Sequence, residues 1–321
     1  MDDAAIARVR GFNRTVTQCV GALDERYLAR DRPLGAARVL WEIGEDGCDV
    51  RSLRARLSLD SGYLSRLLRS LEADRLVNVG VGASDRRVRT ARLTAKGRGE
   101  RQLLDSRSDA LARSLLDPLT ERQRERLVAA MGEVQALLTA ALVQVDVVDP
   151  ADPQAQHCLQ EYFSELARRF PAGFDPGPGL PVELDAMRPP AGVFLVATLL
   201  GEPVGCGGLK LHADQPPDVK RMWIAPSARG LGLGRRLLTE LEARAAASGS
   251  DVIRLETNGA LTEAITMYRS SGYREVAAFN DEPYAQLWFE KRLDGVSRAA
   301  AGEGRDGPVG RRRRAPTPGR P

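Results

Sequence analysis

The turn Arg229–Gly234 has the residue types and the spacing to bind a phosphate-bearing ligand. The apolar segment Val219–Ile224 leads into this turn, and an amphipathic segment that starts at Arg235 follows it. Glycine adopts positive φ readily, so the backbone N–H groups of such a turn can converge on an anion at the N-terminus of a helix. A strand, a glycine turn and a helix in this order predict a pyrophosphate-binding site.

The segments around this turn predict an α/β domain over residues 143–293. Strands alternate with helices here, which indicates a mixed central sheet flanked by helices, with a ligand at the strand ends. The predicted strands are 144–148, 192–199, 204–211, 218–224, 251–257, one after Tyr273, and 284–293; the predicted helices are 153–170, 232–248 and 261–271. Residues 171–192 are rich in proline and glycine, which indicates a connection or a substrate-side loop.

This order of elements resembles the GNAT superfamily of acetyl-CoA-dependent N-acetyltransferases. Arg229-x-x-Gly232-x-Gly234 matches the pyrophosphate motif of that family, and Ala264–Tyr273 matches its second hallmark, Ala-x-x-Leu-Tyr-x-x-x-Gly-Phe/Tyr. The resemblance implies that acetyl-CoA is the co-substrate and that an amine attacks the thioester directly. It also implies that strand 218–224 splays from its neighbour and opens a slot for the pantetheine arm. The scattered cysteines and the two histidines predict that no metal is bound.

The resemblance assigns the binding of acetyl-CoA to the end of strand 218–224 and to the glycine turn. A backbone N–H near Trp223 and Ile224 is expected to stabilise the oxyanion. Asn258 is expected to hydrogen-bond acetyl-CoA or the acceptor, with turn formation as the alternative. The predicted cofactor-binding residues are Trp223, Ile224, Arg229, Gly230, Leu231, Gly232, Leu233, Gly234, Arg235 and Asn258.

Three residues are candidates for proton transfer in this reaction. Tyr268 lies in the second motif and is placed to protonate the departing thiolate, because a phenol (pKa ~10) is only modestly weaker as an acid than a thiol (~8.5). Asp218 begins the key strand and Glu256 lies near the end of the neighbouring strand, so either could accept the amine proton through water. The alternatives are a core aromatic for Tyr268 and solvated strand-end charges for the two carboxylates.

The first half of the chain predicts a mainly α-helical domain. Helical patterns cover 4–30, 34–43, 50–57, 60–71, 94–116 and 119–142, and strands 77–81 and 88–93 flank a basic tip at 82–87. The helices 50–57 and 60–71 have the lengths of a helix-turn-helix. A hairpin with an arginine tip after them is typical of a winged helix, whose tip can enter a minor groove.

Residues 4–142 resemble the MarR family of winged-helix regulators, on the Asp85–Arg87 wing, the Leu93–Gly97 segment and the outer helices. The resemblance implies that double-stranded DNA is a partner and that helix 60–73 enters the major groove. It also implies a homodimer formed by the first and the last two helices. The predicted DNA-binding residues are Ser61, Tyr63, Ser65, Arg66, Arg69, Arg86 and Arg87. Taken alone, the polar face of 60–71 could equally be solvated.

Charge separates the two halves. Residues 1–142 carry 25 Lys/Arg against 20 Asp/Glu, whereas residues 143–293 carry 15 against 20. An anionic polymer therefore fits the first half, and a single anionic ligand fits the second. Residues 294–321 combine glycine, proline and the arginine block 311–314, and this composition predicts a disordered basic tail.

The remaining composition argues against several classes of protein. The four cysteines are scattered and only two histidines are present, so neither a disulfide framework nor a zinc site is expected. No apolar run reaches about 18 residues, and Met1–Asp3 is acidic where a signal peptide would be basic. We therefore expect a cytoplasmic protein with no membrane partner.

These patterns divide the chain into a winged-helix domain (1–142), a GNAT domain (143–293) and a tail (294–321). The leading hypothesis is a DNA-binding transcriptional regulator that also acetylates a primary amine of a small molecule or a protein. The alternative is a regulator whose GNAT-like domain only senses acetyl-CoA or another ligand. A third possibility keeps the enzyme and leaves the winged helix as a dimerisation scaffold.

Overall fold

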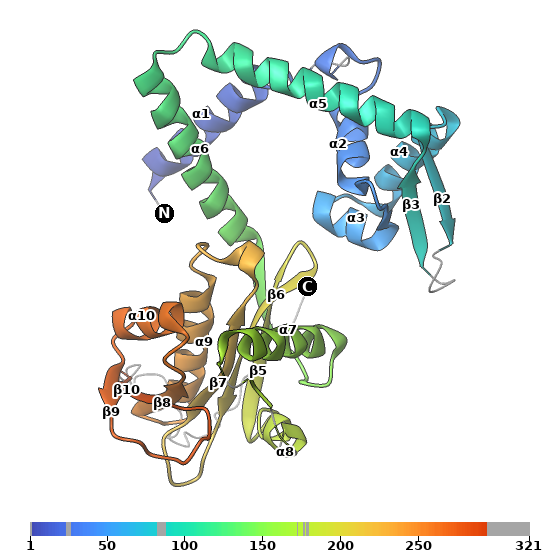
Figure 1. The fold of residues 1–321 in the computed structure, drawn as a ribbon. Coiled ribbons are helices and arrows are strands. Elements are labelled where there is room, and N and C mark those ends of the chain that lie inside the picture. The colour runs from blue at the N-terminus through green and yellow to red at the C-terminus, as the bar shows by residue number, and fades with distance from the viewer. Residues whose placement is uncertain are drawn as a thin grey trace, which may run out of the picture.

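The computed structural model describes residues 2–23, 27–81, 88–171, 173–175, 177 and 180–293. A helical N-terminal part and an α/β C-terminal part are joined by the long helix α6 (Glu121–Leu142), which continues directly into strand β4 (Val143–Val147) (Figure 1). The predicted tail and the hairpin tip 82–87, with Arg86 and Arg87, lie outside the described residues.

The N-terminal part packs helices and a small sheet around one core. Its other elements are α1 (Asp3–Cys19), the 3₁₀ turn η1 (Tyr27–Ala29), α2 (Leu34–Ile43), β1 (Cys48–Asp49), α3 (Val50–Leu57), α4 (Ser61–Ala73), β2 (Val77–Val81), β3 (Arg89–Leu93) and α5 (Ala95–Leu116). The three strands pair antiparallel in the order β1-β3-β2. The leucines of α4 (Leu64, Leu67, Leu68 and Leu71) are buried in this core, together with the apolar side of α2.

Local sequence signals set the ends of these helices. Asp49 accepts hydrogen bonds from the N–H groups of Arg51 and Ser52 at the start of α3, and Asp60 accepts one from Tyr63 N–H at the start of α4. Such caps satisfy backbone donors that have no partner within the helix. The bounds of α2 and α3 are those predicted from the sequence.

The predicted first helix, 4–30, is too long. In the structure α1 ends at Cys19, and Gly21 follows it with a φ of +63°. Glycine takes this left-handed conformation without steric cost and commonly terminates a helix. The 3₁₀ turn η1 lies further along, and Leu28 within it has a φ of 52°. The backbone of the predicted helix therefore departs from the α-helical conformation at Leu28 as well.

The C-terminal part contains one mixed sheet with the strand order β4-β5-β6-β7-β8-β10-β9. All its neighbouring strands run antiparallel except β7 and β8, which run parallel. The strands after β4 are β5 (Gly192–Leu199), β6 (Glu202–Lys210), β7 (Asp218–Ile224), β8 (Val252–Thr257), β9 (Arg274–Val276) and β10 (Leu287–Arg292). The helices are α7 (Pro153–Arg169), α8 (Leu180–Asp185), the 3₁₀ turn η2 (Pro226–Ala228), α9 (Leu233–Ala247) and α10 (Thr262–Ser270).

Helices cover both faces of this sheet, because β5 and its neighbours bury side chains on both sides. Leu195 of β5 belongs to the core that contains α9 and α10, whereas its neighbour Phe194 belongs to the core that contains α7. Successive strand residues point to opposite faces, so one strand contributes to both cores. The short helix α8 was not predicted: it lies inside the proline- and glycine-rich stretch, whose composition indicated only a loop.

Candidate active site

Strands β7 and β8 separate toward their C-terminal ends. Within the described residues they share one register pair, Asp218 with Arg254, although both strands continue beyond it. The strands therefore diverge toward Ile224 and Thr257 and leave a wedge between them. This wedge is the slot that the sequence predicted.

A β-bulge interrupts β7 beside the wedge. Cys206 of β6 pairs with Trp223 and Gly208 pairs with Lys220, so Arg221 and Met222 together oppose the single residue Gly207. Arg221 has a φ of 57°, which is the left-handed region. A bulge leaves one residue outside the ladder and redirects its side chain. The bulge thus lies directly before Trp223 and Ile224, where the oxyanion donor was expected.

The glycine turn has the conformation that an anion cradle requires. Gly230 and Gly232 have φ values of +80° and +72°, and a Cβ added at either would meet no atom within 4 Å. Gly232 is the N-cap of α9, and no side chain caps that helix. The N–H groups of its first turn are consequently open to a ligand.

A cavity of about 520 Å³ opens beside this turn. Its walls are α7, the end of β7, the turn itself and α10. The predicted cofactor-binding residues that line it are Trp223, Ile224, Arg229, Gly230, Gly232, Leu233, Gly234 and Arg235. Leu231 does not line it. The bare helix terminus, the open glycines and the adjoining wedge fit a ligand with a pyrophosphate and a long thin arm, as acetyl-CoA has.

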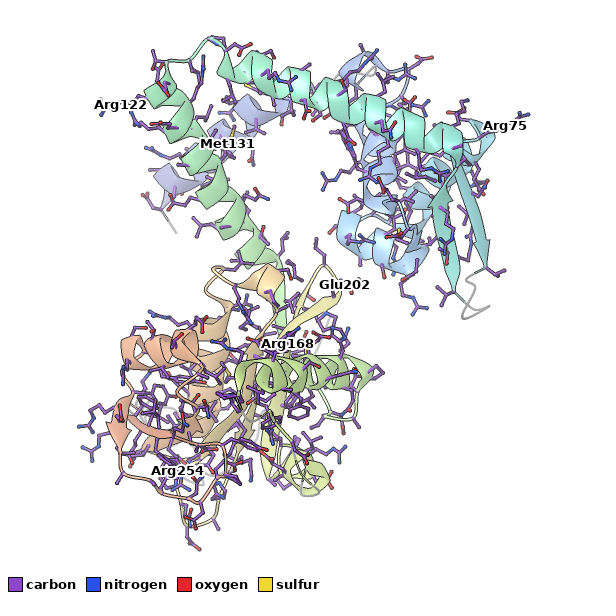
Figure 2. The ribbon with its side chains drawn as sticks, in the orientation of Figure 1. Arg75, Arg122, Met131, Arg168, Glu202 and Arg254 are labelled. Carbon is purple, nitrogen blue, oxygen red and sulfur yellow. The ribbon has the colours of Figure 1, made fainter. Side chains whose placement is uncertain are left out.

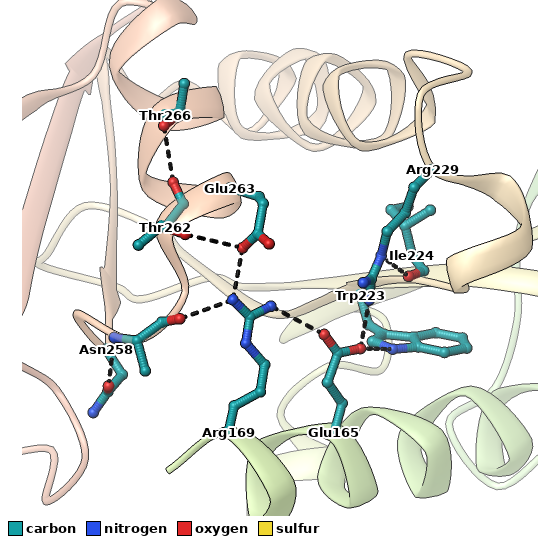
Figure 3. Close-up of polar contacts among 10 residues, drawn as sticks. Glu165, Arg169, Trp223, Ile224, Arg229, Asn258, Thr262, Glu263 and Thr266 are labelled. Carbon is teal, nitrogen blue, oxygen red and sulfur yellow. Dashed lines mark hydrogen bonds and ion pairs between the residues drawn. The ribbon is translucent and has the colours of Figure 1, made fainter. Parts of the chain in front are cut away.

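Glu165 of α7 is the centre of a polar network on one wall of this cavity (Figure 3). It accepts hydrogen bonds from Trp223 Nε1 (2.9 Å), Arg229 Nη2 (2.6 Å) and Arg169 Nη1 (3.2 Å). Arg169 also donates to Glu263 of α10 (2.6 Å), and this hydrogen bond lowers the pKa of the Glu263 carboxyl. The network ties α7, the end of β7, the glycine turn and α10 together around the cavity.

A second, smaller cavity of about 90 Å³ adjoins the first. The described residues common to the walls of both are Tyr162, Met222, Leu261, Ala264 and Tyr268. The second cavity is otherwise lined by aromatic, aliphatic and polar side chains, by charged residues of β7, β8 and α8, and by Glu282. Two ligands that enter from opposite sides would therefore meet at these five residues.

Tyr162 and Tyr268 both lie at this junction. Tyr268 is 5% exposed, and burial raises the pKa of its phenol above the usual value. No group of the described residues hydrogen-bonds to its hydroxyl, while its ring packs 5.9 Å from that of Tyr273 and 6.1 Å from that of Phe289. Burial also raises the pKa of Tyr162 to about 12. Both phenols thus keep their protons at neutral pH.

The predicted base candidates occupy different places. Glu256 lines the second cavity, where its carboxylate is paired with Lys220 and accepts a bond of 3.4 Å from Asn280. Asp218 lines neither cavity. Its carboxylate is bound by Arg254 (2.6 Å) and His212 (2.9 Å) at the closed end of the wedge. The structure brings Glu256, but not Asp218, to Tyr268.

Asn258 also departs from its predicted role. Its side-chain oxygen accepts from Ala260 N–H (2.9 Å), and its amide donates to the carbonyl of Tyr284 (2.9 Å). Both amide groups are therefore used in holding the turn after β8, which was the alternative. Asn258 lines the second cavity rather than the first.

Several residues of the site were not predicted from the sequence. Glu165 and Arg169 are charged residues four apart on α7, a spacing that is ordinary on any solvated helix. Lys220 and Arg221 lie in an apolar strand, where two adjacent charges could have been noticed. Buried charges are uncommon unless they are paired, and both of these are.

A separate basic groove lies in the N-terminal part. Ser61 and Ser65 of α4 line it together with Arg51 and Arg54 of α3 and Arg89 of β3. These arginines were not predicted as part of a binding surface. The groove lies beside β3, which leads from the hairpin tip.

The other residues of α4 that were expected to contact DNA differ in exposure. Arg66 and Arg69 are exposed, and the guanidinium of Arg66 lies 5.7 Å from the ring centre of Tyr63. Tyr63 itself is half-buried, and its hydroxyl lies against Gly35 of α2. The ring of Tyr63 is thus largely used in packing.

The described residues contain neither a metal-binding cluster nor a helix that could cross a membrane. No group of three or more His, Cys, Asp or Glu side chains there could hold a metal ion. No helix in this part of the chain is both long and apolar enough to cross a membrane.

Several known proteins are similar to this chain. The family model described as acetyltransferase (GNAT) domain matches residues 190–275. An IAA acetyltransferase of Azospirillum brasilense is 36% identical over 117 residues, which are 35% of this chain and 75% of that protein. The HTH-type transcriptional regulator TtmR of Methylorubrum extorquens is 36% identical over 107 residues, which are 30% of this chain and 53% of that protein.

Solved structures are similar as well. A GNAT family acetyltransferase from Elizabethkingia anophelis, crystallised with acetyl-CoA bound, has 14% sequence identity and a TM-score of 0.37. The superposition covers 47% of this chain and 99% of that one.

Proposed function

The chain belongs to the GNAT acetyltransferase family and is an acetyl-CoA-dependent N-acetyltransferase. From this premise we propose that it acetylates a primary amine at the junction of the two cavities, and that its N-terminal part binds double-stranded DNA as a MarR-type regulator. The observation that carries the catalytic proposal is the meeting of the cavities at Tyr268. A cytoplasmic location is part of the same proposal.

In this proposal acetyl-CoA binds in the cavity of about 520 Å³ beside the glycine turn. The first-turn N–H groups of α9 and the turn at Gly230 and Gly232 bind the pyrophosphate, and the wedge between β7 and β8 takes the pantetheine arm. Arg229 already hydrogen-bonds Glu165 and the carbonyl of Ile224. These contacts fix the turn, so that its amides are pre-organised before the ligand arrives.

The amine approaches from the second cavity and attacks the thioester carbonyl carbon. A carbon–nitrogen bond forms, the carbon–sulfur bond breaks, and negative charge develops first on the carbonyl oxygen and then on sulfur. A backbone N–H at the bulge of β7 stabilises the oxyanion. Tyr268 gives its proton to the thiolate, and the amine proton passes through water to a carboxylate, for which we propose Glu256 because it lines the same cavity.

For the N-terminal part we propose that α4 enters the major groove of DNA. The exposed Arg66 and Arg69, with the basic groove of Arg51, Arg54 and Arg89, support this proposal. Arginine contacts with phosphates release counterions, so binding should weaken steeply as salt rises. The similarity to an HTH-type transcriptional regulator points the same way.

Unpartnered apolar side chains support a homodimer. Ile6, Val9, Phe12 and Val16 follow one another at helical spacing on α1 and are 39–59% exposed, and no residue of α1 is buried. Helix α6 likewise exposes Val128, Met131, Leu137 and Leu138, of which Met131 is labelled in Figure 2. A monomer gains little from such surfaces, and a second copy would bury them.

One contact favours a second role, in which acetyl-CoA alters DNA binding. Arg236, next to the cavity residue Arg235, donates to the carbonyl of Val143 (2.8 Å), where α6 becomes β4. The helix that carries the glycine turn is thereby connected to the helix that leads to the N-terminal part. A ligand that shifts α9 could therefore shift α6.

Two measurements test these proposals. Thiol release from acetyl-CoA in the presence of a panel of primary amines tests catalysis; acetyl-CoA binding with no release for any amine would contradict it and favour the sensing role. Binding to the DNA upstream of its own coding region, measured across salt concentrations, tests the regulator. The double variant R66A/R69A should abolish that binding at moderate salt, and unchanged binding would remove α4 as the contact.

A further inference from the structure

The residues that line the second cavity indicate which kind of acceptor it could bind. Besides the five junction residues it contains two ion pairs, Lys220 with Glu256 and Arg221 with Glu183. The Lys220, Glu256 and Arg221 side chains are only 10%, 7% and 11% exposed. Removing such charges from water costs several kcal/mol per ion, and this cost is offset only by close counter-charges. Ion pairs this deep are therefore expected to serve recognition.

Arg221 is the least satisfied of these charged residues. It lies in the bulge of β7 with a φ of 57°, and its guanidinium is 5.2 Å from the ring centre of Phe163. Its Nη2 donates to Glu183, but its buried Nε has no acceptor among the described residues. A buried donor without a partner is unfavourable. Arg221 also lines the cavity, where a ligand can reach its guanidinium. The planar guanidinium suits a carboxylate.

Glu256 can supply the negative charge that the ammonium group of a substrate requires. An amine substrate enters as an ammonium ion, and Glu256, the proposed proton acceptor, lines this cavity together with Glu282. A ligand with one ammonium and one carboxylate group would thus find a counter-charge for each.

One part of the cavity wall is apolar, beside the polar Thr257, Asn258 and Glu282. Phe170, Phe174 and Tyr284 contact one another with ring centres 4.8–5.9 Å apart. Leu166 continues this wall. Aromatic rings provide contact area for an apolar or aromatic group.

We propose that the acceptor is a free α-amino acid with an aromatic or aliphatic side chain, which becomes its N-acetyl derivative. Its carboxylate binds Arg221, its amino group lies toward Glu256, and its side chain packs on the aromatic wall. The substrate ammonium loses two protons as its nitrogen gains the acetyl group: one passes through water to Glu256 and on to solvent, and the other replaces the proton that Tyr268 gives to CoA, which leaves as the thiol. This inference rests on the proposed acetyl transfer at the junction.

The test compares three acceptors that differ only at the carboxyl group: L-phenylalanine, L-phenylalaninamide and phenethylamine. We expect kcat/KM for L-phenylalanine to exceed that for either carboxylate-free amine by at least tenfold. In Arg221→Gln the ratio between L-phenylalanine and phenethylamine should fall toward one. The matched control is Arg188→Gln, which removes an arginine that pairs with Asp149 outside both cavities and should leave the ratio unchanged.

Should Arg221→Gln fail to fold, Glu183→Gln tests the same pair from α8 and should alter the same ratio. If the unsubstituted protein has an equal or higher kcat/KM for phenethylamine than for L-phenylalanine, the proposal of an amino-acid acceptor is wrong, although acetyl transfer itself is demonstrated. An absence of thiol release with every primary amine, with acetyl-CoA still bound in calorimetry, overturns the proposed catalysis and this inference together. The two failures are thus distinguishable.

Discussion

Removing the hydroxyl of Tyr268 is the sharpest test of the mechanism. In Tyr268→Phe the ring remains, so its packing against Tyr273 and Phe289 is preserved. The hydroxyl makes no hydrogen bond to the described residues that its loss would break. The substitution therefore removes the proposed acid and little else.

The expected loss follows from the chemistry of the leaving group. General acid catalysis contributes roughly 10²–10⁴-fold, and a thiolate needs less assistance than an amide nitrogen or an alkoxide. We therefore expect the low end, a fall in kcat of about 100-fold, or about 2.7 kcal/mol in the activation free energy. The Kd for acetyl-CoA should stay within about twofold, because the phenol acts on the thiolate that forms only during the reaction.

The assay is thiol release under saturating acetyl-CoA, with acetyl-CoA binding measured separately by calorimetry. The matched control is Tyr273→Phe, which removes a buried hydroxyl next to Tyr268 from a residue that lines neither cavity. A loss in Tyr268→Phe of less than threefold, or one equal to that of the control, would refute Tyr268 as the acid.

The pH profile provides an independent check. The active form of Tyr268 is the protonated phenol, and burial raises its pKa, so the acid is retained as pH rises. The rate of the unsubstituted protein should therefore show no loss from deprotonation of Tyr268 below about pH 10. A decline near pH 8 that is absent in Tyr268→Phe would contradict the raised pKa.

Three further substitutions test the cradle, the dimer and the N-terminal packing. Gly232→Val should raise the Kd for acetyl-CoA at least tenfold in calorimetry, because a β-branched residue cannot take the φ of +72° that directs the N–H groups of the turn toward the anion. The control is Gly249→Val, at a similar φ of +92° beyond the other end of α9, which should leave this Kd unchanged. Phe12→Asp should convert a dimer to monomers in analytical ultracentrifugation, since it places a charge in the apolar stripe of α1, and a persistent dimer would show that α1 is not the interface. Glu100→Gln should lower the free energy of unfolding by about 2 kcal/mol at pH 7, because Glu100 accepts two hydrogen bonds from Arg30 (2.7 and 2.8 Å) that lower its pKa. A depressed carboxyl pKa stabilises the fold above the unfolded-state pKa of about 4.3 and is lost as pH falls through the folded value, so the difference in urea midpoints should vanish well below pH 4; a difference that is independent of pH would contradict the ion pair as its source.

Much of the helical and strand pattern could be predicted from the sequence, because its signals are local. The caps Asp49, Asp60 and Thr94 and the leucine stripe of α4 each lie within a few residues of the element they define. The first helix was overextended because an amphipathic pattern continues past Gly21, and α8 was missed because proline and glycine dominate its surroundings. In both cases composition and backbone conformation gave conflicting signals.

The cofactor side of the site could be predicted from the sequence alone. The glycine turn, the strand before it and the Tyr268 motif are contiguous segments, so their conformations and their likeness to a family can be recognised without the fold. The use of the remaining charges, in contrast, depends on tertiary contacts. The carboxylate of Asp218 pairs with Arg254, which is 36 residues away in the chain. Glu256 pairs instead with Lys220 in the second cavity. Glu165 pairs with Arg229, which is 64 residues away. Such pairings depend on which strands diverge and which helices cover them, and that information is spread over the whole domain.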